Sequence, residues 1–207
     1  MYIQALWINA KANNRGNGLA HLQKLAQMVR DDYGAPSRVY MGVTNGPANL
    51  MALGTTFESV ADLINGNDTV GQSAALATWS EEAVNYLELA TAEWQTFGFL
   101  RSGGGMTTNF TQTASVSFRP GHMVKARELL GTLADHYESV YKRPVDILSL
   151  EGGLHYRHFI QIGYDDMAQY DADQTALASD PVYAKWAQDV LEHFDGPTIE
   201  RSIGRWF

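Results

Sequence analysis

The chain has 207 residues, of which 45% are hydrophobic and 18% are charged, so it can bury a core as one large domain or two small ones. Its net charge of −8 argues against nucleic acid as the main partner, since phosphate binding needs clustered cations. It has no Cys, which excludes disulfides, thiolate metal sites and Cys nucleophiles. It shows neither an apolar run of membrane-spanning length nor a basic-then-apolar leader, so we expect a soluble, cytoplasmic protein with no membrane partner.

The first half of the chain is predicted to contain seven elements. Turn residues Asn45-Gly46-Pro47 lie between two short apolar runs, which is typical of a hairpin. The predicted order is strand, helix, strand, strand, helix, helix, strand, over residues 2–9, 19–33, 38–44, 49–55, 57–64, 72–89 and 91–101.

Three consecutive glycines, Gly103-Gly104-Gly105, follow near the middle of the chain. Glycine weakens both helices and strands, so the chain is expected to turn or to run loosely here. The predicted organisation is a first domain over residues 1–101, a glycine-rich linker over 102–111 and a second domain over 112–207.

The second half shows the clearer pattern. Apolar and polar residues alternate over 112–118, as in a half-buried strand, and Pro144 ends a helix of amphipathic spacing. Asp180 is the expected N-cap of a later helix that has Pro181 at its first position. The predicted order repeats that of the first half, over residues 112–118, 123–141, 145–150, 155–162, 165–178, 181–194 and 198–207.

The two halves correspond at a constant shift of 107 residues. Trp79 falls on Trp186 and Phe57 on Tyr164, and hydrophobic classes match along a long stretch. We therefore predict a tandem duplication, with both tryptophans in the core.

Each half has the strand and helix order of a ferredoxin-like unit with one extra helix. The antiparallel sheet of such a unit carries helices on one face only and leaves the other face needing a partner. The predicted fold class is α+β, with two ferredoxin-like repeats whose sheets face each other as an intramolecular α+β barrel.

Three motifs in the second half carry a family resemblance. They are Arg119-Pro120-Gly121 at a helix start, Tyr164-Asp165-Asp166-Met167-Ala168 after a strand, and Ala178-Ser179-Asp180-Pro181 leading to Trp186. This half resembles the NIPSNAP-like branch of the dimeric α+β barrel superfamily, which also holds cofactor-independent antibiotic-biosynthesis monooxygenases. The first half keeps the layout without these motifs. Because the motifs are packing and capping signals, the resemblance implies the fold and leaves the activity open.

Metal and phosphate chemistry find little support in the sequence. His155 and His158 would point to opposite faces of a predicted strand, and the other histidines lack a second ligand one helical turn away. We therefore expect no metal and no cofactor. No Gly-x-Ser-x-Gly elbow or phosphate-binding loop occurs either. His136 has Asp135 and Glu138 nearby, which a solvated helix face explains as well as a metal site would. The acidic cluster Asp165, Asp166, Asp171 and Asp173 lacks the spacing of a calcium loop and is interpreted as a solvated helix face.

Strand faces give the candidate site. In the second half we assign His158, Ile160 and Ile162 to the helix-covered face, and the opposite face to His155, Arg157, Phe159 and Gln161. In a cavity between the sheets, His155 could move a proton and Arg157 could hold an anionic or carbonyl oxygen. The predicted substrate-binding residues are Trp7, Asn9, Trp94, Phe159 and Gln161. In the monooxygenases of the resembled superfamily, Asn, Trp and His side chains act on phenolic substrates, and Asn9 and Trp7 are similar to that set in residue type.

Two functions stay open. One is a cofactor-independent enzyme (of oxygenase, isomerase or cyclase type) or a binding protein for a small aromatic or anionic molecule. The other is a non-catalytic structural or interaction module, in which Arg157 pairs with a carboxylate and holds the sheets in register. Among partners we expect a small-molecule ligand and no nucleic acid, with a homodimer as a further option.

Overall fold

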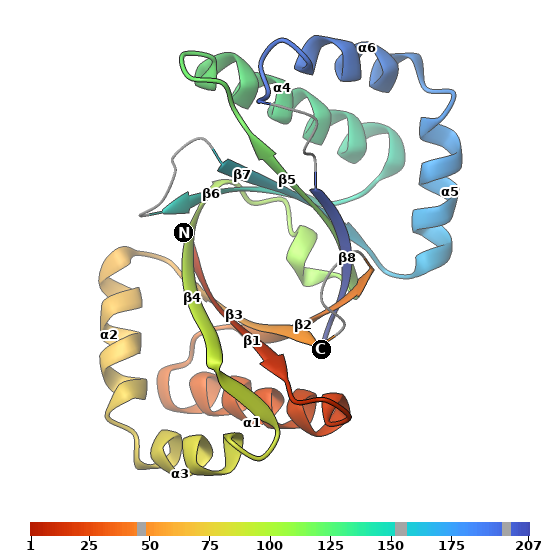
Figure 1. The fold of residues 1–207 in the computed structure, drawn as a ribbon. Coiled ribbons are helices and arrows are strands. Elements are labelled where there is room, and N and C mark those ends of the chain that lie inside the picture. Colours follow the sequence, from red (N-terminus) through yellow and green to blue (C-terminus); the bar gives the residue numbers. More distant parts are fainter. Residues whose placement is uncertain (45–48, 152–156, 196–199) are drawn as a thin grey trace. The chain divides into compact units, whose positions relative to one another are not determined.

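A computed structural model describes most of the chain, namely residues 1–44, 49–151, 157–195 and 200–207. The chain forms two compact units: unit 1 comprises Met1–Gly98 with Arg205–Phe207, and unit 2 comprises Phe99–Gly204. Within each unit, helices cover one face of an antiparallel sheet (Figure 1). None of the described helices is long and apolar enough to cross a membrane.

Unit 1 contains a four-stranded sheet in the order β4-β1-β3-β2, which is the ferredoxin-like order. The C-terminal Phe207 extends this sheet, since it exchanges two backbone hydrogen bonds with Val39, of 2.9 and 3.3 Å. The elements are β1 Tyr2–Ala10, α1 Arg15–Tyr33, β2 Ser37–Thr44, β3 Leu50–Phe57, α2 Val60–Gly71, α3 Ala74–Ala83 and β4 Leu87–Arg101, whose last three residues belong to unit 2.

Unit 2 repeats this arrangement with the strand order β8-β5-β7-β6. Its elements are η1 Gly105–Thr107, β5 Phe110–Ser117, α4 Met123–His136, η2 Tyr137–Tyr141, β6 Val145–Glu151, β7 Arg157–Tyr164, α5 Met167–Leu177, α6 Pro181–Val190 and β8 Glu200–Trp206, whose last two residues belong to unit 1. The expected fold class is confirmed: the protein is α+β, with antiparallel sheets in two ferredoxin-like units.

Each unit is stabilised internally by hydrogen bonds that occur at equivalent positions in both units. The indole nitrogen of Trp79 donates to the carbonyl oxygen of His21 on α1, and that of Trp186 donates to Leu129 on α4, both at 2.8 Å. Both tryptophans are buried in their own unit's core, as predicted. The N-caps Ser59 of α2 and Asp166 of α5 each accept a backbone N–H three residues further on. These pairs define which positions of the two units correspond.

The glycine segment expected to be a linker is held firmly by unit 2. The carboxylate of Asp146, which is 1% exposed, accepts the backbone N–H groups of Gly103, Gly104 and Met106 at 2.8–2.9 Å. A Cβ on Gly105 would lie 2.5 Å from the carbonyl oxygen of Gln161. The glycines therefore serve a close backbone approach to the sheet, and the chain turns here rather than running loosely.

Three local expectations are wrong. The helix predicted over residues 72–89 ends at Ala83, because the chain turns at Asn85 and Tyr86 and enters β4 at Leu87. Asp173 does not lie on a solvated face: it is 5% exposed and accepts from Arg143 at 2.7 and 3.1 Å.

His136 is the third correction. Its side chain is 11% exposed, and its Nε2 lies 2.6 Å from a carboxylate oxygen of Asp180. Its two acidic neighbours on the chain, Asp135 and Glu138, accept from Arg101. Periodicity missed this because the partner of His136 comes from a helix start 44 residues away.

Candidate functional site

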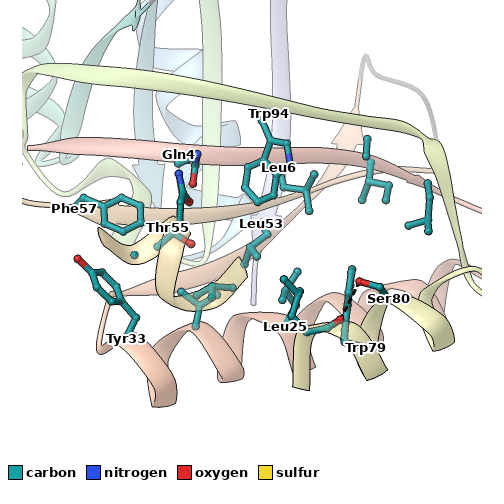
Figure 2. Close-up of a pocket in the computed structure, with 18 residues that line it drawn as sticks. Gln4, Leu6, Leu25, Tyr33, Leu53, Thr55, Phe57, Trp79, Ser80 and Trp94 are labelled. Atoms are coloured by element: carbon teal, nitrogen blue, oxygen red, sulfur yellow. Dashed lines mark hydrogen bonds between the residues drawn. The ribbon is translucent and has the colours of Figure 1, made fainter. Parts of the chain in front are cut away.

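A cavity of about 250 Å³ lies in unit 1, between the sheet and its helices (Figure 2). We call it the helix-side cavity. Strands β1, β3 and β4 supply one wall and helices α1, α2 and α3 the other. Its lining is mostly apolar and consists of Gln4, Leu6, Ile8, Leu25, Val29, Tyr33, Leu53, Thr55, Phe57, Gly66, Asn67, Val70, Leu76, Trp79, Ser80, Leu89, Ala92 and Trp94.

Small residues and close packing of α2 shape this cavity. Gly66 of α2 faces the rings of Phe57 and Tyr33, and a Cβ at Gly66 would lie 2.8 Å from each ring. The helix therefore approaches the sheet more closely than any other residue would permit. The hydroxyl of Tyr33 donates to the carbonyl oxygen of Asp62, which fixes that ring at the end of the cavity.

A bulge in β4 forms the opposite wall. Trp7 pairs with Glu93 but Asn9 pairs with Glu88, so four residues of β4, 89–92, oppose Ile8 alone. Thr91 fixes the bulge: its hydroxyl donates to the carbonyl oxygen of Glu88 at 2.7 Å and accepts the N–H of Asn9 at 3.0 Å. The bulge brings Leu89 and Ala92 to the cavity wall.

Trp94 is the most exposed aromatic residue of the cavity. It comes from β4 directly after the bulge and points from that strand toward the helix layer (Figure 2). Its side of the sheet follows from the register, because it pairs with the buried Leu6, which packs on the helices. Trp94 is nevertheless 57% exposed. A large ring that lines a cavity while remaining so exposed offers a stacking surface for a planar ligand.

The cavity carries no formal charge. Its lining, all of it within the described residues, includes no Asp, Glu, Lys, Arg or His. Four of its polar side chains already have partners. Tyr33 donates to Asp62 and Trp79 to His21, the hydroxyl of Thr55 lies 3.0 Å from that of Ser37, and Ser80 donates to Leu76 at 2.9 Å. Burying an unpaired charge in such surroundings would be costly, so the cavity suits an uncharged ligand.

The structure separates the predicted substrate-binding residues of unit 1. Trp94 lines the helix-side cavity, whereas Trp7 and Asn9 lie on the opposite face of the same sheet. The reason is strand alternation: Leu6 and Ile8 point to the helices, so the residues between and beyond them point away. The Trp7 ring packs edge-on against the Tyr40 ring, with 6.0 Å between the ring centres. The indole nitrogen of Trp7 and the side-chain oxygen of Asn9 are buried, and neither has a hydrogen-bond partner among the residues that the structure describes.

The predicted residues of unit 2 that the structure describes share one face, as expected. Arg157, Phe159 and Gln161 alternate along β7 with His158. The His158 ring stacks on Phe118 of the helix-covered core, with 4.3 Å between the ring centres. Arg157 donates to the hydroxyl of Ser115 at 2.7 Å, and its guanidinium lies 5.4 Å from the centre of the Phe159 ring. The amide of Gln161 reaches the Thr113 hydroxyl only at 3.5 Å.

His155, the predicted proton carrier, lies outside the described residues, so its partnership with Arg157 stays a prediction. Among the described residues, no group of three or more His, Cys, Asp or Glu side chains could hold a metal ion.

Comparisons with known proteins found no matching family model and no matching curated protein. Solved structures do match. A provisionally assigned monooxygenase from Fusobacterium nucleatum superposes with a TM-score of 0.72 at 7% identity, covering 99% of this chain and 91% of that one. An anthrone oxidase-like protein superposes with a TM-score of 0.66 at 12% identity, covering 100% of this chain and 91% of that one. The chain has the fold of the dimeric α+β barrel proteins. At these identities the likeness establishes the fold and nothing about the reaction.

One of the matching solved structures is named as a haem-binding protein. A haem-binding protein from Thermus thermophilus superposes with a TM-score of 0.52 at 13% identity, covering 99% of this chain and 91% of that one. Haem iron is held by an axial His, Cys, Met or Tyr. The lining of the helix-side cavity offers only Tyr33, whose hydroxyl is bound to Asp62. The residues of this cavity therefore do not fit haem.

Proposed function

We propose that unit 1 binds a small, uncharged aromatic molecule in the helix-side cavity. The observation that carries this proposal is the lining: apolar side chains, a few neutral polar groups and the half-exposed ring of Trp94. A flat ligand would stack on Trp94 and bury its rings between β1 and α1. The fold shared with proteins named monooxygenase and anthrone oxidase-like supports the same class of ligand.

The reaction we propose is oxygenation of an activated CH₂ group without a bound cofactor. Molecular oxygen would insert one atom to form a carbonyl, and the second atom would leave as water with the two hydrogens of the CH₂. The substrate supplies all four electrons, so no external reductant is needed. The cavity itself would contribute orientation and exclusion of water, because no side chain of its lining offers a base of ordinary strength.

Binding without conversion is the second candidate, and the absence of Asp, Glu, Lys, Arg and His from the lining favours it. Anthrone, a three-ring ketone with one activated CH₂, separates the two. At pH 6.5 an enzyme would consume one O₂ per anthrone faster than the uncatalysed solution, whereas a binding protein would quench Trp fluorescence with the oxidation rate unchanged.

Trp94→Ala tests the site. We expect the dissociation constant for anthrone to rise by about tenfold or more, since a stacking surface and its buried area are lost. The measurement is a fluorescence or calorimetric titration with thermal unfolding as the check on folding.

Trp7→Phe is the matched control for Trp94→Ala, because Trp7 lies on the other face of the sheet. It is expected to leave the affinity within about twofold. Loss of binding in Trp7→Phe with none in Trp94→Ala would place the ligand on the sheet face of Trp7 and Asn9 instead.

The evolutionary origin of the two units and the roles of the predicted site residues in unit 2 are also proposals. We infer that units 1 and 2 arose by tandem duplication, which is supported by their common strand order and by the equivalent bonds of Trp79 and Trp186. The NIPSNAP-like affinity of unit 2 and a ligand role for His155, Arg157, Phe159 and Gln161 stay predictions. So does the alternative of an interaction module.

A further inference from the structure

The region of unit 2 that corresponds to the helix-side cavity can be located from the equivalent bonds. Val29 on α1 comes eight residues after His21, and Tyr137 comes eight residues after Leu129, the two acceptors of the core tryptophans. In the same way, Gly66 and Asp173 each lie seven residues after the N-cap of their helix.

A third pair follows from the prolines that precede β2 and β6. The carbonyl oxygens of Pro36 and Pro144 both accept a backbone N–H from the next strand, from Thr56 and Gly163, at 2.9 Å. The residues before these prolines are Ala35 in unit 1 and Arg143 in unit 2.

At these positions unit 2 has larger side chains, namely Tyr137, Arg143 and Asp173. Tyr137 is 3% exposed and belongs to the core of the unit. Arg143 makes two hydrogen bonds to Asp173, and its guanidinium lies 5.6 Å from the centre of the Tyr164 ring. Tyr164, the counterpart of the cavity-lining Phe57, packs edge-on against Tyr170 at 5.5 Å. Aromatic rings and a buried ion pair therefore occupy this part of unit 2.

Unit 1 has Val29, Gly66 and Ala35 at the same places, and two of these three residues line its cavity. We propose that Val29 and Gly66 are the size-determining residues of the ligand site, and that each chain takes up one such ligand, in unit 1. This inference rests on the proposed function. Val29 leaves the volume that Tyr137 fills in unit 2, and Gly66 lets α2 approach the sheet without the ion pair that Asp173 forms.

Variants at Val29 test the inference in both directions. Val29→Tyr copies the residue of unit 2 and fills the cavity, so the affinity for three-ring anthrone is expected to fall at least tenfold relative to that for one-ring phenol. Val29→Ala enlarges the cavity and is expected to move the anthrone-to-phenol preference the opposite way. Because removal of two methyl groups is a mild core change, Val29→Ala keeps the test valid if Val29→Tyr does not fold.

Tyr137→Phe is the control, since it retains the ring of unit 2 and lies outside the cavity; its ligand preference should equal that of the wild type. Calorimetric titration with anthrone, 1-naphthol and phenol gives affinity and stoichiometry together. One anthrone per chain and opposite shifts in the two Val29 variants support the inference. Wild-type preference in both variants, or two anthrones per chain, overturns it while the proposed function survives. No binding of any probe to the wild type overturns both.

Discussion

Asp146→Ala is expected to destabilise the protein by about 3–5 kcal/mol, because three backbone N–H groups lose their common acceptor in a buried setting. These groups belong to Gly103, Gly104 and Met106. The close packing of Gly105 against Gln161 leaves little room for the loop to rearrange. Denaturant unfolding of the wild type and variant measures the difference.

Asp146→Asn is the matched control for this prediction. The asparagine oxygen can still accept from Gly103 and Gly104, while its NH₂ group faces the N–H of Met106. The loss is therefore expected to lie between zero and that of the alanine variant. A wild-type free energy of unfolding in Asp146→Ala would show that the glycine segment is not anchored by this carboxylate.

Asp180→Ala is expected to cost about 2–4 kcal/mol, the sum of a lost N-cap and of two side-chain donors left without their acceptor. One carboxylate oxygen of Asp180 accepts the N–H groups of Val182 and Tyr183 at the start of α6, at 2.9 and 3.1 Å. The other accepts from Tyr141 and His136, both at 2.6 Å. The side chain is only 10% exposed, so water replaces these bonds poorly.

The Asp180 carboxylate also gives this prediction a pH dependence. The hydrogen bond from Tyr141, followed by that from His136, holds the pKa of Asp180 well below its usual range. A depressed folded-state pKa stabilises the protein above the unfolded-state value of about 3.9 and loses that contribution as the pH falls below it. The stability difference between wild type and Asp180→Asn is therefore expected to shrink from pH 7 to pH 2. A difference that is constant over this range would contradict the assignment.

Local chemistry in the sequence predicted much of the fold. Alternation assigned the residues of β7 to the correct faces, and Asp180 with Pro181 marked the start of α6. The shift of 107 residues also holds in the structure from Ser59 and Asp166 onward. At Pro36 and Pro144 the shift is 108, and it is already 107 at Thr56 and Gly163, since the hairpin segment of unit 2 is one residue shorter.

The cavity could not be predicted in the same way, because it depends on side chains that are small or absent. Gly66 is a weak signal in a sequence, and its role follows only from the nearness of Phe57 and Tyr33. The orientation of Trp94 depends on the β4 bulge, whose length is set by pairing with a strand some eighty residues earlier. The one sequence signal for the cavity is the difference in size between Val29 and Tyr137. It can be recognised only after the structures of the two units have shown that these positions are equivalent.

A crystal structure of the protein with bound anthrone tests the central claim most directly. The account predicts ligand density between the sheet and helices of unit 1, with the rings stacked on Trp94 and in contact with Val29 and Gly66. Density on the opposite face of that sheet, against Trp7 and Asn9, would contradict it.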